Sequence, residues 1–385
     1  MSSVVVLRER RPGERRVAAT PETVRRMVKE GLSVVVEAGA GAGAHIPDQR
    51  YEEAGAALAT DPRRALLGAD LALRVSSPFH SEELGDEASL LQEGAVVVGL
   101  LDPFRTLETV RTLARRGVSA LAMELVPRIS RAQRIDALSS QASLAGYKAA
   151  LLAATHLDKQ LPLMMTAAGT VQPARFVVLG AGVAGLQAVA TAHRLGAVVE
   201  VSDVRPAVRE QVQSLGARFI ELPELEQAET AGGYARQASA EFLSRQREIL
   251  KAHLAKADAA IATAQVPGKP APTLITAEMV EAMRPGAVIV DLAAEQGGNC
   301  ELTVPGQDVE RGGVLIIGRT NLPATVAADA SALYARNVLE VVLLVASKGE
   351  VRLDLEDPIV AAMLLTHGGE VKNAAVAALL EGGAE

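Results

Sequence analysis

The sequence predicts an α/β protein with two parallel-sheet domains, which are joined by two long helices and separated by a cleft. Three observations lead to this prediction. The chain has 385 residues, a length that suggests two domains. Short apolar runs alternate with helical patterns, as in parallel sheets whose faces are covered by helices. Two long helical patterns rich in Ala and Leu, at residues 141–161 and 325–347, interrupt this alternation.

The first domain begins with a strand, a helix and a second strand. The helix is expected to start at Thr20-Pro21-Glu22. Threonine is a good N-cap, proline fits the first helical position, and an acid there meets the positive end of the helix dipole. Helical stretches separate the later apolar runs. The strands expected in this domain are residues 4–7, 33–37, 69–75, 95–100 and 120–124.

The stretch from residue 174 to residue 203 predicts a Rossmann-like dinucleotide-binding unit. It consists of an apolar strand, the turn Gly180-Ala181-Gly182-Val183-Ala184-Gly185, a helix and a strand that ends in Asp203. The first glycine permits a tight turn, the second lets the backbone approach a pyrophosphate, and the third lets the helix pack on the sheet. The helix N-terminus offers N–H groups to the phosphates, and the acid accepts from the adenosine ribose hydroxyls.

Asp203 favours NAD(H) over NADP(H), because a carboxylate repels a 2′-phosphate. Arg205 follows two residues later, so this preference stays open.

Four more strands are expected near residues 218–222, 259–263, 287–292 and 314–318. The second long helical pattern should return the chain to the first domain, where residues 351–372 would pack. We therefore predict a discontinuous first domain, residues 1–140 plus 345–385. Residues 141–344 would form an inserted NAD(H)-binding domain that includes the connecting helices.

The composition excludes several classes of protein. The net charge is -7 with both signs interspersed, which argues against a surface for nucleic acid or anionic membrane. No segment has the apolar length of a membrane span, and the N-terminus lacks the apolar run of a signal peptide. The single cysteine, Cys300, excludes an intramolecular disulfide, and we interpret it as a small packing residue rather than a nucleophile. These features predict a soluble protein of a reducing cytoplasm.

Two polar segments are candidates for function. Residues 123–141 follow a predicted strand and contain three arginines, Arg128, Arg131 and Arg134, where open α/β sheets place ligands. The alternative is that they form surface salt bridges. Residues 223–250 are longer than a standard connection and contain Gly232-Gly233-Tyr234, which suits a flap that closes on a ligand. A disordered surface insertion is the alternative.

No metal site is expected, because none of the six histidines lies three or four residues from another. Asp291 and residues 295–299 end a late strand. They border the nicotinamide or serve only turn chemistry.

Together these features resemble the alanine dehydrogenase/nicotinamide-nucleotide transhydrogenase superfamily along essentially the whole chain. Residues 13–22, 36–41, 48–56 and 180–203 carry the resemblance. Alanine dehydrogenases use a lysine after the third strand and a histidine after the next one, to hold pyruvate and move protons. Here Arg74 stands in place of the lysine, and the matching stretch 98–103 has no histidine. Without that proton shuttle, amino-acid oxidation is disfavoured.

The loop at 128–139 is instead similar to that of the soluble NAD(H)-binding component of proton-translocating NAD(P) transhydrogenase, and the Gly-Gly-Tyr flap resembles its mobile loop. The resemblance implies that Gln133 holds the nicotinamide at the interface with a partner. It also implies that Arg128, Asp136 and Ser139 fix the ring and ribose, while Val183, Asp203 and Val204 lie along the adenosine half. The cofactor-binding residues expected are Gly180, Ala181, Gly182, Val183, Gly185, Asp203, Val204, Arg205, Gly233, Tyr234, Gln246, Ala264 and Gln265.

Such a component transfers hydride directly from NADH to NADP⁺, so it needs proximity and orientation rather than an acid or base. A partner subunit would hold NADP(H), because this chain has one glycine fingerprint. Separate membrane subunits would move the protons. The resemblance further implies a homodimer docked on the cytoplasmic face of the membrane. Two rival functions remain, an amino-acid dehydrogenase with an unusual site and an NADH-sensing module without turnover.

Overall fold

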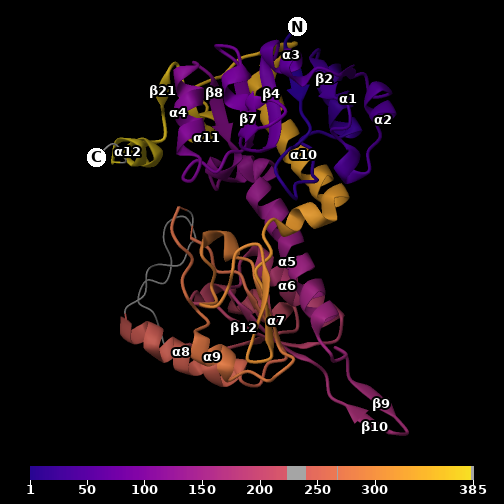
Figure 1. The fold of residues 1–385 in the computed structure, drawn as a ribbon, viewed down its shortest axis with the longest axis vertical. Coiled ribbons are helices and arrows are strands. Elements are labelled where there is room, and N and C mark those ends of the chain that lie inside the picture. The colour runs from indigo at the N-terminus through magenta and orange to yellow at the C-terminus, as the bar shows by residue number, and fades with distance from the viewer. Residues whose placement is uncertain (223–239, 267, 383–385) are drawn as a thin grey trace. The chain divides into compact units, whose positions relative to one another are not determined.

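The computed structural model describes residues 1–222, 240–266 and 268–382 (Figure 1). The chain forms two compact units. Unit 1 comprises Met1–Gln141 with Ala324–Glu385, and unit 2 comprises Ala142–Pro323. Each unit is built around one mainly parallel sheet, which confirms the predicted fold class.

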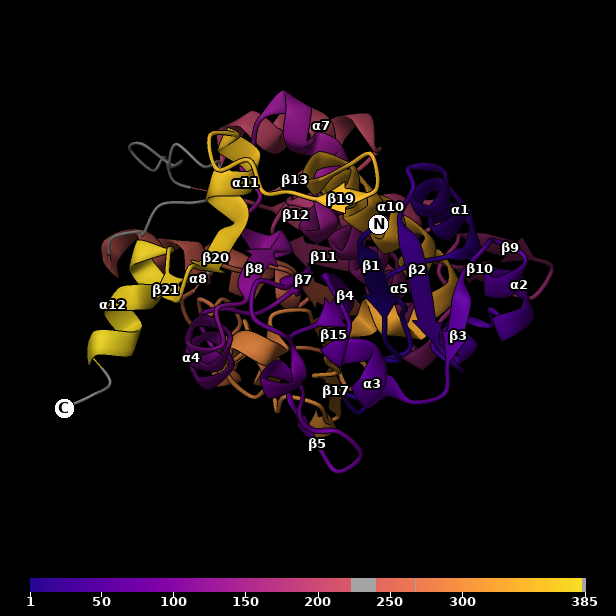
Figure 2. The same cartoon turned by 90° about the horizontal axis from the view of Figure 1, so that it is seen from above.

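The sheet of unit 1 has eight strands in the order β21-β20-β8-β7-β4-β1-β2-β3. Six of them are parallel, and Figure 2 shows these six following one another from β8 to β3. The antiparallel hairpin β20–β21 extends the sheet beside β8. The strands are β1 (Ser3–Val6), β2 (Ser33–Glu37), β3 (Ala57–Ala59), β4 (Leu71–Ser76), β7 (Val96–Leu100), β8 (Ser119–Ala122), β20 (Leu364–His367) and β21 (Glu370–Val371).

Helices cover both faces of this sheet. They are α1 (Pro21–Lys29), α2 (Asp48–Glu52), α3 (Pro62–Leu67), α4 (Leu107–Arg115), α10 (Ala327–Val345), α11 (Pro358–Met363) and α12 (Ala374–Gly382). Helix α1 begins at Pro21 with Thr20 as N-cap, as predicted, and the Thr23 hydroxyl accepts from the Thr20 N–H at 2.9 Å. Two small hairpins complete the unit, β5 (His80–Ser81) with β6 (Gly85–Asp86) and β18 (Ala346–Ser347) with β19 (Glu350–Val351).

The core of unit 1 follows the two-residue period of its strands. Val4 and Val6 of β1 pack in one cluster with residues of α1 and α10, whereas Val5 packs in a second cluster with residues of α3 and α4. Both clusters consist mainly of Ala, Val and Leu, in keeping with the scarcity of aromatic residues.

Helix α10 belongs to unit 1. From the sequence we assigned it to the inserted domain and placed the second boundary at residue 345, but the units divide between Pro323 and Ala324. The physical reason is burial, because Tyr334, Val338 and Val342 of α10 pack in the same core as β1 and α1.

The sheet of unit 2 has seven strands in the order β13-β12-β11-β14-β15-β17-β16, and only the edge strand β16 is antiparallel. These strands are β11 (Arg175–Leu179), β12 (Val198–Ser202), β13 (Arg218–Phe219), β14 (Ala259–Ala262), β15 (Val288–Asp291), β16 (Asp308–Arg311) and β17 (Val314–Ile317). Core residues of α6 (Val183–Arg194) and α7 (Arg209–Ser214) pack in one cluster, and those of α8 (Ala240–Leu254) and α9 (Ala277–Glu281) in another.

Two further elements involve unit 2. Helix α5 (Ala137–His156) carries the chain from unit 1 into unit 2. A hairpin of β9 (Met164–Thr166) and β10 (Gly169–Val171) follows it, and both of its strands are exposed.

Candidate functional site

The glycine turn joins β11 directly to α6. β11 ends at Leu179, and Gly182 is the N-cap of α6, which begins at Val183. Gly180 has a φ of +100°, where a residue with a side chain would be strained. A Cβ at Gly180 would also lie 2.6 Å from Oγ1 of Thr263, whose hydroxyl donates to the Gly180 carbonyl at 3.2 Å. The first glycine of the motif therefore meets both a conformational and a steric requirement.

The other two glycines have opposite surroundings. A Cβ on Gly185 would lie 1.8 Å from the Gly180 carbonyl oxygen, so the first turn of the helix packs directly on the strand end. A Cβ on Gly182 would meet no atom within 4 Å, and Gly182 is exposed. Open space over backbone N–H groups at a helix N-terminus is what a phosphate group needs. These residues therefore fit the pyrophosphate of a dinucleotide.

Asp203 follows β12 and lies beside this turn. Its Oδ2 accepts from the Ala181 N–H at 2.7 Å, and its Oδ1 accepts from the Arg205 N–H at 2.8 Å. The Arg205 side chain donates to both carboxylate oxygens, through Nε and Nη2, at 2.9 Å each. The structure thus brings together the glycine turn, the acid and Arg205, with Val204 half-buried between the last two.

The carboxyl end of β14 borders the same turn. Thr263 bonds to the turn, and Ala264 and Gln265 come next in the chain. Gln265 is exposed, and its side chain donates to the Leu292 carbonyl at 2.7 Å. The residue that fixes this segment is the fully buried Asn299, the last residue of the 295–299 stretch noted in the sequence. Gly297 and Gly298, both at positive φ, precede it.

The predicted nicotinamide loop lies at the carboxyl end of β8 in unit 1. Two 3₁₀ helices, Met123–Leu125 and Ser130–Ile135, lead from β8 to α5. Asp136 accepts from the Ser139 N–H at 2.9 Å and from the Ser139 hydroxyl at 2.5 Å, so this pair holds the first turn of α5. Arg128 and Gln133 are exposed on the loop.

Ion pairs and an asparagine fasten this loop to the rest of unit 1. Arg131 donates to Asp357 at 2.7 Å, and Arg134 pairs with Glu340 of α10 at 2.6 Å. Asn337 of α10, which was not among the predicted residues, donates to the Arg134 carbonyl at 2.7 Å. Two of the three loop arginines therefore make the surface salt bridges that were the alternative interpretation.

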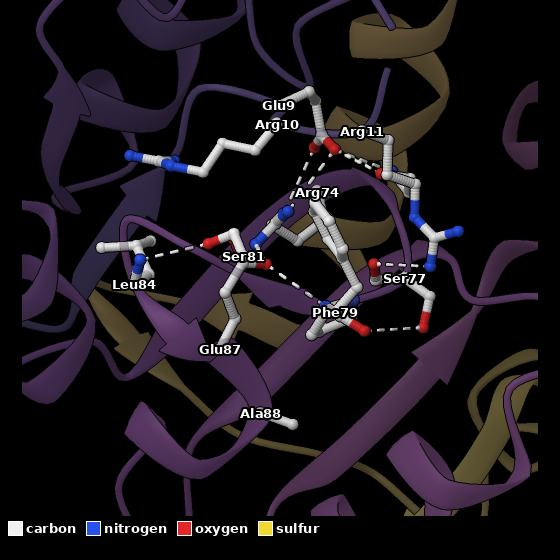
Figure 3. A network of polar contacts seen from close by, with 12 residues as sticks. Glu9, Arg10, Arg11, Arg74, Ser77, Phe79, Ser81, Leu84, Glu87 and Ala88 are labelled. Carbon is white, nitrogen blue, oxygen red and sulfur yellow. Dashed lines mark hydrogen bonds and ion pairs between the residues drawn. The ribbon is translucent and has the colours of Figure 1, made fainter. Parts of the chain in front are cut away.

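Arg74, at the position of the dehydrogenase lysine, is fully buried in β4. Its Nη1 donates to Glu87 at 2.8 Å and its Nε to Glu9 at 3.2 Å, and Figure 3 shows the arginine between these two acids. Burial opposes the charge, but the two carboxylates outweigh it and raise the pKa of Arg74. The Tyr334 hydroxyl also donates to the Arg74 carbonyl at 2.7 Å. This side chain is a structural counter-ion inside the unit.

The stretch that lacks the dehydrogenase histidine contains Asp102, just after β7. Its carboxylate accepts from Arg105 Nε at 2.7 Å, and its N–H donates to Oε1 of Glu124 at 2.6 Å. Burial raises the pKa of Glu124 to about 7, although hydrogen bonds from backbone N–H groups such as that of Asp102 oppose this. Oε2 of Glu124 has no hydrogen-bond partner among the residues that the structure describes. Glu124 was not predicted as a special residue, because nothing in the sequence marks a carboxyl that the fold will bury.

The remaining predicted residues fall into two groups. Gln246 is a buried residue of α8, and its contact with a nucleotide stays a prediction. Gly233 and Tyr234 lie outside the described residues.

Asp291 serves the turn chemistry that was one of its two interpretations. It is fully buried and accepts from the Ala293 and Cys300 N–H groups at 2.9 Å each, and from the Thr303 hydroxyl at 2.7 Å. Cys300 is buried, which raises the pKa of its thiol to about 11. This agrees with a packing role rather than that of a nucleophile.

Metal-binding clusters and membrane-spanning helices are both absent from the described ranges. Within residues 1–222, 240–266 and 268–382, no group of three or more His, Cys, Asp or Glu side chains is arranged to hold a metal ion. None of the helices in this part of the chain has the length and hydropathy of a membrane span.

Comparison with known proteins gives consistent matches along the chain. The N-terminal domain of the alanine dehydrogenase/PNT family matches residues 5–145, and its C-terminal domain matches residues 149–374. A Rhodospirillum rubrum protein, named as the first part of NAD(P) transhydrogenase subunit alpha, is 49% identical over 377 residues, which cover 97% of this chain and 98% of the relative. Alanine dehydrogenase of Bacillus subtilis is 30% identical over 380 residues, covering 97% of this chain and 93% of the relative.

Solved structures agree with these matches. A transhydrogenase from Sinorhizobium meliloti superimposes with a TM-score of 0.85 at 47% identity, covering 96% of this chain and 99% of that one. An L-alanine dehydrogenase superimposes with a TM-score of 0.81 at 27% identity, covering 99% of each chain.

Proposed function

The chain belongs to the alanine dehydrogenase/PNT family, and on that premise we propose that it is the NAD(H)-binding component of a proton-translocating NAD(P) transhydrogenase. Its reaction is direct hydride transfer from NADH to NADP⁺ held by a partner subunit. Separate membrane subunits couple this transfer to proton movement. The higher identity to transhydrogenase subunits than to alanine dehydrogenases supports this choice.

One observation carries the choice between the two activities of the family. Arg74 forms ion pairs with Glu9 and Glu87 in the interior of unit 1. An amino-acid dehydrogenase needs groups that hold a carboxylate substrate and exchange a proton with it. A buried, doubly paired guanidinium does neither, so a site for amino-acid oxidation has no support here.

The chain's own residues bind and orient the dinucleotide. NADH supplies the hydride, so no acid or base of this chain is needed at the reacting carbons. The N-terminus of α6, with Gly182 and Val183, holds the pyrophosphate. Asp203 and Val204 line the adenosine half. On the family resemblance, we assign Arg128, Gln133, Asp136 and Ser139 to the nicotinamide end.

The proposal includes an assembly. The chain forms a homodimer and docks with an NADP(H)-binding subunit and a membrane-spanning subunit. It is therefore placed at the cytoplasmic face of the membrane through its partners. The name of the Rhodospirillum rubrum relative describes only one portion of subunit alpha, which supports a division of the enzyme among several polypeptides.

Hydride exchange tests the proposal. The purified chain is mixed with NADH, an acetylated NAD⁺ analogue and NADP⁺, with and without a separately expressed NADP(H)-binding component. Reduction of the analogue that requires both proteins is the expected result. NADH binding without exchange in any pairing indicates a sensing module. Alanine-dependent NAD⁺ reduction by the chain alone indicates a dehydrogenase.

A matched pair of variants tests the role of the loop. Gln133→Ala should slow exchange by about tenfold or more while NADH binding by the isolated chain changes little, because orientation rather than affinity is lost. The control is Gln49→Ala, an exposed glutamine of α2 that bonds only to Glu53 in the described structure. Equal exchange rates for the two variants would remove Gln133 from the proposed site.

A further inference from the structure

The carboxylate of Asp203 is fully engaged within the chain. An ionised carboxylate has about four acceptor positions. Asp203 already accepts four hydrogen bonds, two from the backbone N–H groups of Ala181 and Arg205 and two from the Arg205 guanidinium. A ribose hydroxyl can bond to this acid only by sharing an oxygen with a present donor or by displacing one. The two donors from the Arg205 side chain are the ones that a rotation can remove.

The pair is also shielded from solvent. The Asp203 side chain is 6% exposed and that of Arg205 is 19% exposed. Charges that are largely out of water interact more strongly than exposed ones. The fork of Nε and Nη2 facing both oxygens is the strong form of this contact. Arg205 therefore cancels much of the negative potential that Asp203 alone would present.

From this pairing we infer that Arg205 sets how strongly the site distinguishes NADH from NADPH. The inference rests on the proposed function, in which Asp203 meets the adenosine ribose. Rejection of NADPH comes from repulsion between the acid and the 2′-phosphate. Because Arg205 neutralises the acid, it weakens this repulsion, and it also competes with the ribose hydroxyls for the same oxygens. Removal of its charge should act in one direction through both effects, favouring NADH and disfavouring NADPH.

Arg209 provides a matched control nearby. It begins α7, pairs with Glu221, and lies over the ring of Phe219 with its guanidinium carbon 5.4 Å from the ring centroid. It has no contact with Asp203 among the described interactions. Removing the charge of Arg209 changes the net charge of the chain as much as removing that of Arg205. It leaves the ion pair between Arg205 and Asp203 in place.

The experiment measures dissociation constants for NADH and NADPH by nucleotide fluorescence, with the isolated full chain. The variants are Arg205→Gln, Arg205→Lys and Arg209→Gln. Arg205→Gln should raise the ratio of the NADPH to the NADH dissociation constant by about tenfold, and high salt should reduce this rise. Arg209→Gln should leave the ratio near that of the unaltered chain. Arg205→Lys, which keeps the charge but not the fork, should raise the ratio less than Arg205→Gln does.

A second variant tests the same effect by removing the charge of the acid instead of the charge of the arginine. In Asp203→Asn the guanidinium loses its counter-charge, so the ratio should fall and NADPH should bind more tightly than it does to the unaltered chain. An unchanged or lower ratio in Arg205→Gln overturns the inference, as does unaltered NADPH binding in Asp203→Asn. If the unaltered chain binds neither nucleotide, the proposed function itself fails and the inference falls with it.

Discussion

The side-chain amide of Asn299 pairs with both backbone polar groups of Ala264. Its Oδ1 accepts from the Ala264 N–H and its Nδ2 donates to the Ala264 carbonyl, each at 2.9 Å. Nδ2 also donates to the Pro272 carbonyl at 2.8 Å. One buried amide thus fixes the segment after β14, which carries two of the proposed cofactor-binding residues.

Asn299→Ala should therefore destabilise the chain and weaken NADH binding together. The change leaves the backbone groups of the half-buried Ala264 without these partners, and the cost is about 1–3 kcal/mol for a group that stays out of water. The exposed Pro272 carbonyl can bond to water instead. Urea denaturation and an NADH titration measure the two effects. The exposed Gln213 of α7 serves as control, and Gln213→Ala should change neither. Unaltered NADH affinity in Asn299→Ala would show that the segment does not contribute to the site.

Two alanine substitutions in the glycine turn should have different effects, one on the stability of the chain and the other on NADH binding. Gly185→Ala places a Cβ against the Gly180 carbonyl at 1.8 Å, so the helix must move off the strand and the unfolding free energy should fall by about 1–3 kcal/mol or more. Gly182→Ala meets no atom within 4 Å, so the chain should fold normally. Its new methyl group would occupy the proposed phosphate space, and NADH binding should be lost. Circular dichroism melts and NADH titrations distinguish the two. Normal NADH affinity in Gly182→Ala would contradict the phosphate assignment.

Arg74→Met should unfold the chain at much lower urea concentrations. The substitution keeps the apolar bulk but leaves Glu9 and Glu87 buried without their cation, which costs about 3–5 kcal/mol. Arg336→Met, which breaks the exposed pair with Glu22, should cost at most about 0.5 kcal/mol. Similar midpoints for the two variants would mean that the buried pairing contributes little.

Glu124 should make stability fall as the pH rises from about 4.5 to about 7. Burial raises its folded-state pKa from 4.5 to about 7, so in this window the folded chain keeps a proton that the unfolded chain has lost. The state with more bound protons is disfavoured as pH rises. Glu124→Gln cannot ionise. Its unfolding free energy relative to the unaltered chain should therefore increase by about 3 kcal/mol across the window. Glu108→Gln, on the exposed face of α4, is the control. If the unfolding free energies of Glu124→Gln and of the unaltered chain change in parallel with pH, the raised pKa of Glu124 is refuted.

Cys300 should resist thiol reagents in the folded chain. It is 1% exposed, and burial raises its pKa to about 11, so little thiolate forms at neutral pH. A colorimetric thiol reagent should show about one reactive thiol only after denaturation. Rapid labelling of the native chain would indicate that the segment around β15 opens readily.

Local patterns predicted the elements that a short sequence window contains. The apolar run, three glycines and acid between residues 174 and 203 predicted β11, α6 and β12 in order. The short strands β3, β20 and β21 were not predicted, because two to four residues carry little periodicity, and β3 and β21 also lie at the sheet edges. β16 was missed because its residues, Asp308–Arg311, are mostly polar at the outer edge. Residues 295–299 were noted, but the pairing of Asn299 with Ala264 was not predicted, and Asn337 was missed. An asparagine that pairs with distant backbone looks like any other in sequence.

The sequence by itself determined the α/β order and the glycine turn, because strand period, helix capping and the conformational freedom of glycine are properties of neighbouring residues. Only the tertiary structure decided which charges are available for chemistry. Glu9 lies 65 positions from Arg74 in the chain, yet it neutralises that arginine inside unit 1. The fold likewise joined α10 to unit 1 and buried Glu124. Burial and electrostatic energy depend on neighbours in space, and the sequence does not give these directly.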